Sequence, residues 1–281
     1  MMNLSERLDL EEILRREFRV DWGHGDVTSR LTIPPKQHGR ARIRAKQRGV
    51  LAGAHAVELA AMIVGGEVRV VSLREDGTLF EAGTVIAELE GNVRALLALE
   101  RVTLNVLQHL SGVATLTRQY VAAVEGTRAR IVDTRKTLPG LRSLQKYAVR
   151  VGGGHNHRFH LADGILIKNN HIAAVGGVQQ AVELARKHGP HTLRVEVECR
   201  SLDQVDEALA AGAEAILLDN MDLSTLRLAV ERVGGRAITE ASGGVTLATV
   251  RAIAETGVDL ISVGALTHSA PAVDLHMLVE Q

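Results

Sequence analysis

The sequence has almost no cysteine and no excess of charge of either sign. Its 281 residues include a single cysteine, Cys199, which excludes an internal disulfide framework and a zinc site built from several cysteines. Lys and Arg together number 33, as do Asp and Glu, so the formal net charge at pH 7 is zero. A neutral chain has no overall field that would recruit nucleic acid or an anionic membrane. Any site for an anion must therefore be local.

Long apolar segments are also missing. No uninterrupted apolar run approaches the length that spans a bilayer, and residues 1–12 lack the apolar core of a signal peptide. We therefore expect a cytoplasmic protein, and the single cysteine agrees with a reducing compartment. The hydrophobic fraction of 46% is ample for a buried core, and the length favours two domains.

The first part of the chain predicts a mixed α/β domain. Alternating or apolar segments predict strands at residues 40–46, 68–73 and 84–89, and helical periodicity predicts helices at residues 5–19 and 55–64. An antiparallel sheet covered by a helix is the economical interpretation. A long helical pattern follows at residues 95–125, and we expect it to break at Ser111 and Gly112, where the domain boundary would lie.

After residue 126, strand and helix patterns alternate. Apolar segments predict strands at residues 129–133, 164–168, 193–198, 214–219, 236–240 and 259–263. Amphipathic segments separate most of them, and this order is typical of parallel β/α units. The pattern predicts a parallel barrel, with a doubly wound open sheet as the alternative.

Polar residues and glycines end or directly follow each predicted strand. They are Arg135, Lys136, Lys168, Glu198, Asp219, Glu240, Ser242, Gly243, Gly244 and Gly264. In a parallel barrel these strand ends meet on one face, where such enzymes place their chemistry. The sequence therefore predicts a functional site on that face. The late glycines would let backbone N–H groups approach a phosphate, helped by a helix expected to begin near Thr246.

Positive charge is concentrated between residues 133 and 171. The basic group consists of Arg135, Lys136, His157, Arg158 and Lys168. A solvated surface is the usual explanation for a single basic residue, but Arg135, Lys136 and Lys168 directly follow apolar segments. Arginine presents a planar fork and lysine a point charge, so the mixture favours a ligand that has both carboxylate and phosphate groups.

Two alternatives concern metals and ion pairs. His155, His157 and His160 are close enough in sequence to suggest metal ligands, although the neighbouring Arg and Lys would repel a divalent cation. Glu198 and Asp219 end successive strands, so they would suit Mg²⁺ bound to a polyphosphate, or sugar hydroxyls. An ion pair with the basic group is an equally good explanation of these two carboxylates.

Seven short motifs occur in a family order. They are Asp-Thr-Arg-Lys-Thr-x-Pro-Gly from residue 133, Gly-Gly-x-x-x-His-Arg from 152, Ile-Lys-x-Asn-His from 167, Val-Glu-Val-Glu from 195, Leu-Leu-Asp-Asn from 217, Ser-Gly-Gly from 242 and Gly-Ala-Leu-Thr-His-Ser from 264. Together they are highly specific. Over nearly its whole length the sequence resembles the quinolinate phosphoribosyltransferases, the decarboxylating enzymes of de novo NAD synthesis.

The resemblance implies a fold and an assembly. It implies an N-terminal α/β sandwich, residues 1–111 joined by 270–281, and an incomplete α/β barrel of parallel strands, residues 112–269. It also implies a homodimer in which each active site is completed by the partner subunit, or a hexamer built as a trimer of dimers.

The resemblance also implies the reaction. A phosphoribosyl group passes from phosphoribosyl pyrophosphate (PRPP) to quinolinate with decarboxylation, which gives nicotinate mononucleotide, pyrophosphate and carbon dioxide, with Mg²⁺ as cofactor. The alternatives are a nicotinate phosphoribosyltransferase, a ModD-like relative, a His-metal hydrolase or aldolase, and a non-catalytic module that binds a phosphate ligand.

Site residues follow from the resemblance by position. Quinolinate would be bound by Arg135, His157, Arg158 and Lys168, with Arg101 reaching in from the neighbouring subunit. PRPP would be bound by Lys136, Ser242, Gly243, Gly264 and His268, with Glu198 and Asp219 at its ribose and Mg²⁺. Lys136, Lys168, Glu198 and Asp219 are the expected catalytic residues. One departure is Ala241, where the family often has a second serine.

Overall fold

The computed structural model describes residues 2–280, which form two compact units. The first unit consists of Met1–Arg118, Pro139–Gly153 and Ser269–Gln281, and the second consists of Gln119–Leu138 and Gly154–His268. Residues 139–153 thus group with the first unit, although they lie between two strands of the second. The domain limits expected from the sequence stay a prediction.

An antiparallel sheet forms the centre of the first unit. Its strands are β1 (His38–Ala45), β3 (Val68–Leu73), β5 (Val85–Asn92) and β12 (Leu275–Glu280), in the order β12-β1-β5-β3. The three strands predicted at 40–46, 68–73 and 84–89 are confirmed. Strand β12 pairs with β1 over Ala45 to Arg40, which ties the C-terminal segment to this sheet. A further short pair joins β2 (Gly49–Val50) to β4 (Leu79–Phe80).

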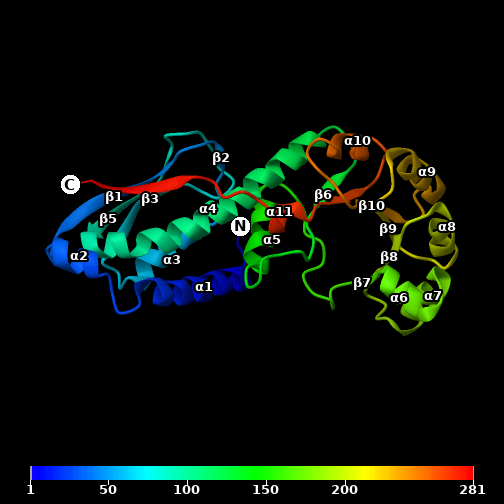
Figure 1. The fold of residues 1–281 in the computed structure, drawn as a ribbon, viewed down its shortest axis with the longest axis horizontal. Helices are drawn as coiled ribbons and strands as arrows, with labels where there is room; N and C mark the ends of the chain where they lie inside the picture. The colour runs from blue at the N-terminus through cyan, green and yellow to red at the C-terminus, as the bar shows by residue number, and fades with distance from the viewer. Residues whose placement is uncertain (1, 281) are drawn as a thin grey trace. The chain divides into compact units, whose positions relative to one another are not determined.

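The first unit also contains the helices of this part of the chain (Figure 1). They are α1 (Leu4–Trp22), α2 (Val27–Thr32), α3 (His55–Ile63), α4 (Val93–Ala123) and α5 (Arg142–Val151). In α1 the apolar side chains of Leu10, Leu14 and Phe18 recur every fourth residue, and all three are buried. This spacing places them on one face of the helix, as the sequence predicts.

The predicted break in the long helix at Ser111 and Gly112 is wrong. Helix α4 continues through both residues. A Cβ at Gly112 would lie 2.1 Å from the carbonyl oxygen of Pro271, and the hydroxyl of Ser111 accepts a hydrogen bond from the backbone N–H of Ala52 at 3.1 Å. Gly112 therefore allows helix α4 to pack closely against the segment at Pro271, and it does not end the helix.

Six parallel strands form the sheet of the second unit. They are β6 (Arg130–Val132), β7 (Ile165–Ile167), β8 (Val195–Cys199), β9 (Ala215–Asp219), β10 (Ile238–Ser242) and β11 (Leu260–Ser262). All six match the predicted segments. The strand order is β6-β11-β10-β9-β8-β7. The edge strands β6 and β7 do not pair with each other within residues 2–280, as expected for an incomplete α/β barrel.

Helices follow the strands of the second unit. They are α6 (Asn169–Val175), α7 (Val178–His188), α8 (Leu202–Ala210), α9 (Leu223–Val233), α10 (Val250–Ala254) and α11 (Ala265–His268). Helices α7, α8 and α9 lie side by side (Figure 1). The helix expected near Thr246 begins only at Val250, because residues 247–249 form a turn first. That part of the prediction is wrong.

Across residues 2–280, no helix combines the length and the apolar character that crossing a membrane requires.

Candidate active site

Polar side chains meet along one edge of the parallel sheet, where the strands end. In the parallel register, Asp219 of β9 lies opposite Ser242 of β10, and Cys199 of β8 lies opposite Leu218 of β9. Following the strand order, the edge presents Arg135 and Lys136, Gly264 and His268, Ser242 and Gly243, Asp219, Glu198, and Lys168. Every predicted site residue except Arg101 therefore belongs to the second unit. Their roles stay predictions.

Arg101 lies in the first unit, on helix α4. Its side chain is 59% exposed, and its nearest acidic partner is Glu100, at 3.8 Å. A long, charged side chain on an exposed helix face can extend far enough to bind a neighbouring molecule.

The guanidinium groups of Arg135 and Arg158 act on each other as like charges. Burial lowers the pKa of Arg158, and the charge of Arg135 lowers it further. Arg158 donates a hydrogen bond to the carbonyl of Gly164 at 2.9 Å. The Nε atom of Arg135 is buried and has no hydrogen-bond partner among residues 2–280. A half-buried pair of like charges favours an anionic ligand, and a planar carboxylate matches a guanidinium best.

A carboxylate pair occupies the ends of β8 and β9. Glu198 is buried, and its Oε1 atom accepts hydrogen bonds from Asn169 at 2.5 Å and from Arg200 at 3.5 Å. The Oδ2 atom of Asp219 accepts one from the same Arg200 at 3.1 Å. Lys168 is 3.9 Å from Glu198. The ion-pair alternative is thus present, but its main partner, Arg200, lies outside the basic group.

The same carboxylates fit the expected metal. Mg²⁺ prefers oxygen ligands and is commonly held by one or two carboxylates together with substrate phosphates. Glu198 and Asp219 supply carboxylates from adjacent strands on an edge that also has Lys136. The donor set is therefore suited to a magnesium ion that arrives with a polyphosphate.

Glycines keep the other end of the edge open. A Cβ at Gly264 would lie 3.1 Å from Cδ of Lys136 and 3.2 Å from Nε2 of His268, so both side chains pass over the bare backbone. A Cβ at Gly243, where φ is +99°, would lie 2.3 Å from Oδ1 of Asn220. The backbone of Lys136 is held by the hydroxyl of Thr267, which donates to its carbonyl at 2.8 Å. Such a surface lets a phosphate approach the main chain closely.

His157 is half-buried, with a side chain that is 16% exposed. Its backbone N–H donates to Asp133 at 2.9 Å, and its Nδ1 atom accepts from the backbone N–H of Arg158 at 2.8 Å. Its Nε2 atom lies 3.3 Å from Glu196 and 3.5 Å from Glu240. Both ring nitrogens therefore already face protein groups.

The structure does not support a metal site built from three histidines. His155 and His160 are exposed, and the potential ligands that converge within residues 2–280 are His157, Glu196 and Glu240. Only one of the three histidines is in that group.

Sequence reasoning missed several residues of the edge. Asn169 and Arg200 contact the carboxylate pair, and each follows a predicted strand by one or two positions. Their position directly after a predicted strand was the signal that could have identified them as site residues. Glu196 gave a second signal, because it is a charged residue between the buried Val195 and Val197.

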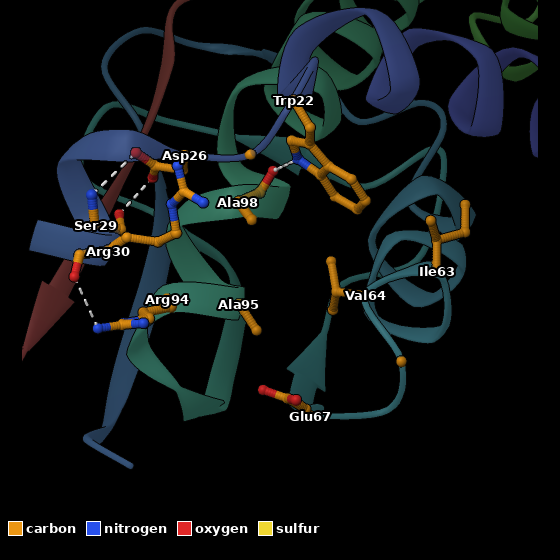
Figure 2. Close-up of a pocket in the computed structure, with 12 residues that line it drawn as sticks. Trp22, Asp26, Ser29, Arg30, Ile63, Val64, Glu67, Arg94, Ala95 and Ala98 are labelled. Carbon is orange, nitrogen blue, oxygen red and sulfur yellow. Dashed lines mark hydrogen bonds between the residues drawn. The ribbon is translucent and has the colours of Figure 1, made fainter. Parts of the chain in front are cut away.

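A separate hollow of about 470 Å³ lies in the first unit (Figure 2). Its polar residues mostly bond to one another: Asp26 caps helix α2 through the backbone N–H of Ser29 at 3.0 Å, and Trp22 donates to the carbonyl of Ala98 at 2.8 Å. Arg94 donates to the carbonyl of Ile33 at 2.8 Å. None of the predicted site residues lines this hollow.

Family models and curated relatives match nearly the whole chain. The family model of the quinolinate phosphoribosyl transferase C-terminal domain matches residues 113–278, and that of the N-terminal domain matches residues 26–111. A protein of Bacillus subtilis named probable nicotinate-nucleotide pyrophosphorylase [carboxylating] is 45% identical over 270 residues, which cover 96% of this chain and 93% of the relative. A Mycobacterium leprae protein named nicotinate-nucleotide pyrophosphorylase [carboxylating] is 44% identical, with 94% and 95% covered.

Solved structures of related proteins have the same fold as this chain. The nicotinate-nucleotide pyrophosphorylase of Francisella tularensis is similar with a TM-score of 0.93 and 37% identity, over 98% of this chain and 97% of that one. Human nicotinic acid phosphoribosyltransferase shares the fold alone, at 13% identity and a TM-score of 0.62. The chain therefore belongs to the quinolinate phosphoribosyltransferase family.

Proposed function

We propose that the protein transfers the phosphoribosyl group of PRPP to quinolinate, removes one carboxylate as carbon dioxide, and so makes nicotinate mononucleotide for NAD biosynthesis. The observation that carries this proposal is the division of one sheet edge into a guanidinium pair, Arg135 with Arg158, and a carboxylate pair, Glu198 with Asp219. The relatives' name describes the same reaction written in reverse, with carboxylation.

The cationic part of the edge would bind quinolinate. Two carboxylates on adjacent ring carbons need several cations, and Arg135, Arg158 and Lys168 supply three. His157 would add a further polar contact. In the proposed homodimer, Arg101 of a neighbouring copy adds a fourth cation. Nicotinate has a single carboxylate and would leave part of this charge without a partner, which favours quinolinate as the substrate.

The other part of the edge would bind PRPP. Lys136, Ser242, Gly243, Gly264 and His268 would contact its phosphates, and Glu198 and Asp219 would hold Mg²⁺ and the ribose. When bound, Mg²⁺ neutralises charge on the pyrophosphate leaving group. Lys136 would add positive charge at the same group, while the carboxylates would favour the positive charge that develops at the anomeric carbon.

The reaction then requires no protein nucleophile. The ring nitrogen of quinolinate attacks the anomeric carbon, the bond from that carbon to the pyrophosphate oxygen breaks, and pyrophosphate leaves with the electron pair. The ring nitrogen is now positively charged. The bond to the adjacent carboxylate breaks next, its electron pair stays on the ring carbon, where the cationic nitrogen stabilises it, and a proton from water completes the product. The protein contributes position and charge.

The cellular setting belongs to the same proposal. We place the enzyme in the cytoplasm as a homodimer, or as a trimer of such dimers. The support is the buried single cysteine, which suits a reducing compartment, and the exposed Arg101 on its helix.

The test incubates the protein with PRPP, Mg²⁺ and either quinolinate or nicotinate, and measures pyrophosphate and carbon dioxide. We expect carbon dioxide only when PRPP and quinolinate are both present. Equal pyrophosphate release with nicotinate would favour a nicotinate phosphoribosyltransferase, and PRPP binding without turnover would favour a binding module. Either outcome would contradict the proposal.

A further inference from the structure

A residue with a left-handed backbone directly follows the proposed magnesium ligand of β9. Among residues 2–280, Asn220 is the only residue other than glycine whose φ is positive, at +56°. This conformation is costly for residues that have a Cβ atom, although asparagine tolerates it better than most. It turns the chain between Asp219, which ends β9, and helix α9, which begins at Leu223. Such outliers are concentrated at functional sites, so the contacts of the Asn220 side chain are informative.

Asn220 joins two neighbouring parts of the sheet edge. Its Nδ2 atom donates a hydrogen bond to Oδ1 of Asp219 at 3.0 Å, and its backbone N–H donates to the carbonyl of Ser242 at 2.9 Å. Asp219 and Ser242 lie opposite each other in the parallel register of β9 and β10. One residue therefore connects the carboxylate that ends β9 to the beginning of the glycine loop after β10.

Gly243 determines how the amide group of Asn220 is oriented. A Cβ at Gly243 would overlap Oδ1 of Asn220 and lie 2.8 Å from its Nδ2 atom, so the amide packs against bare backbone. A carboxylate oxygen accepts hydrogen bonds and does not donate them, so the atom that faces Asp219 is the amide nitrogen. The amide group is thus held between the Asp219 carboxylate and Gly243.

The two oxygens of Asp219 have partners of different mobility. Oδ1 accepts from Asn220, and Oδ2 accepts from Arg200 at 3.1 Å. The Arg200 side chain is 60% exposed, whereas Asn220 is held by its own backbone hydrogen bond and by Gly243. If Arg200 moves away, Oδ2 becomes free for Mg²⁺ while the hydrogen bond from Asn220 still fixes the plane of the carboxylate.

We propose that Asn220 is a positioning residue whose side-chain hydrogen bond orients the Asp219 carboxylate towards Mg²⁺ and PRPP. It acts through Asp219 and not by contact with a substrate. The inference rests on the proposed function, because that proposal assigns Asp219 to Mg²⁺ and to the ribose of PRPP.

Binding of PRPP gives the first test, and it needs no turnover. Isothermal titration calorimetry at saturating Mg²⁺ measures the Kd of PRPP for the wild type, Asn220→Gly and Asp222→Ala. Glycine adopts the left-handed backbone without strain, so Asn220→Gly removes the side chain alone. Asp222 caps helix α9 and accepts a hydrogen bond from the backbone N–H of Thr225 at 2.8 Å. Asp222→Ala therefore controls for a loss of stability in the same turn.

Asn220→Gly should raise the Kd of PRPP about tenfold, because it removes a hydrogen bond to a charged group that orients the ligand. Asp222→Ala should leave this Kd within about twofold of the wild type, since the loss of a helix cap lowers stability without changing the site. In the background of Asp219→Ala, Asn220→Gly should change the Kd by less than about twofold, because the group that it orients is gone. Equal Kd values for the wild type and Asn220→Gly, or the same increase with and without Asp219, would overturn the inference.

Turnover gives the second test. In Asn220→Gly the KM for PRPP should rise while the KM for quinolinate changes little, because the cations at the other part of the edge are untouched. Equal increases in both would show a general disturbance and would also overturn the inference. If the wild type binds PRPP but releases no carbon dioxide with quinolinate, the proposed function fails, and the calorimetric comparison still decides the role of Asn220. A wild type that does not bind PRPP would reject both.

Discussion

Arg200 lies with its Nε atom 3.1 Å from Oδ2 of Asp219, at the end of the adjacent strand. The same guanidinium reaches Glu198 at 3.5 Å. One cation thus spans both carboxylates to which we assign Mg²⁺. Because the Arg200 side chain is 60% exposed, it can swing away, but while in place it competes for the same oxygens.

We therefore expect Arg200→Ala to lower the Mg²⁺ concentration that gives half-maximal activity by about threefold to tenfold. The measurement is a Mg²⁺ titration at saturating quinolinate and PRPP. Arg227→Ala, which removes an exposed arginine from α9, is the matched control. A higher requirement for Mg²⁺ in Arg200→Ala would show instead that the guanidinium helps to bind the substrate.

Loss of a cation from the proposed quinolinate site should abolish most activity without unfolding the protein. Arg135→Ala and Lys168→Ala should each lower kcat/KM for quinolinate more than about a hundredfold, because each variant would lose a charged hydrogen bond to a substrate carboxylate, which contributes up to about 3 kcal/mol. Circular dichroism and thermal melting should stay close to the wild type. Arg194→Ala, at an exposed position just before β8, is the control. Near-normal turnover in either site variant would reject the assignment.

The parallel sheet could be predicted because its strands are short apolar runs, each ending on a polar residue or glycine. Local patterns suffice for that, and they also place Lys168, Glu198 and Asp219 on one edge. They could not reveal the continuity of α4, because the reason for Gly112 lies at Pro271, far along the chain. Tertiary contacts determine whether such a glycine ends a helix, and helix propensity alone does not.

Sequence reasoning could not show that Glu196 lies beside His157 and Glu240, for a related reason. Glu196 alternates with two buried valines, which in a half-solvated strand would place it in water. Here both faces of the strand are covered, so the glutamate is enclosed and needs partners. Its partners His157 and Glu240 come from distant segments, and only the fold brings them together.

Protonation of Glu240 should affect stability. Burial raises the pKa of Glu240 from an ordinary value of 4.5 to about 7 in the folded protein. Between pH 4.5 and 7, the folded state therefore keeps a proton on Glu240 that the unfolded state has lost. This contribution to the free energy of unfolding is complete below pH 4.5 and is lost as the pH rises towards 7. In Glu240→Gln that loss should be absent.

Urea unfolding of the wild type and Glu240→Gln at pH 5, 6, 7 and 8 measures this difference. The variant should gain stability relative to the wild type as the pH increases from 5 to 7, and the gain should level off above 7. Ionisable groups that do not interact with Glu240 are shared, so they cancel in the comparison. Parallel stability curves across this range would contradict a protonated Glu240.

The bare backbone at Gly264 gives the last prediction. A methyl group there would lie 3.1 Å from Cδ of Lys136 and 3.2 Å from Nε2 of His268, closer than ordinary contacts, so both side chains must shift. We expect Gly264→Ala to raise the KM for PRPP about tenfold or more while the KM for quinolinate changes little, because only the phosphate end of the edge is altered. Gly177→Ala is the control, since a methyl group there meets no atom within 4 Å. An equal increase in both KM values would mean that the substitution disturbs the whole edge, and no change in either would remove Lys136 and His268 from the PRPP site.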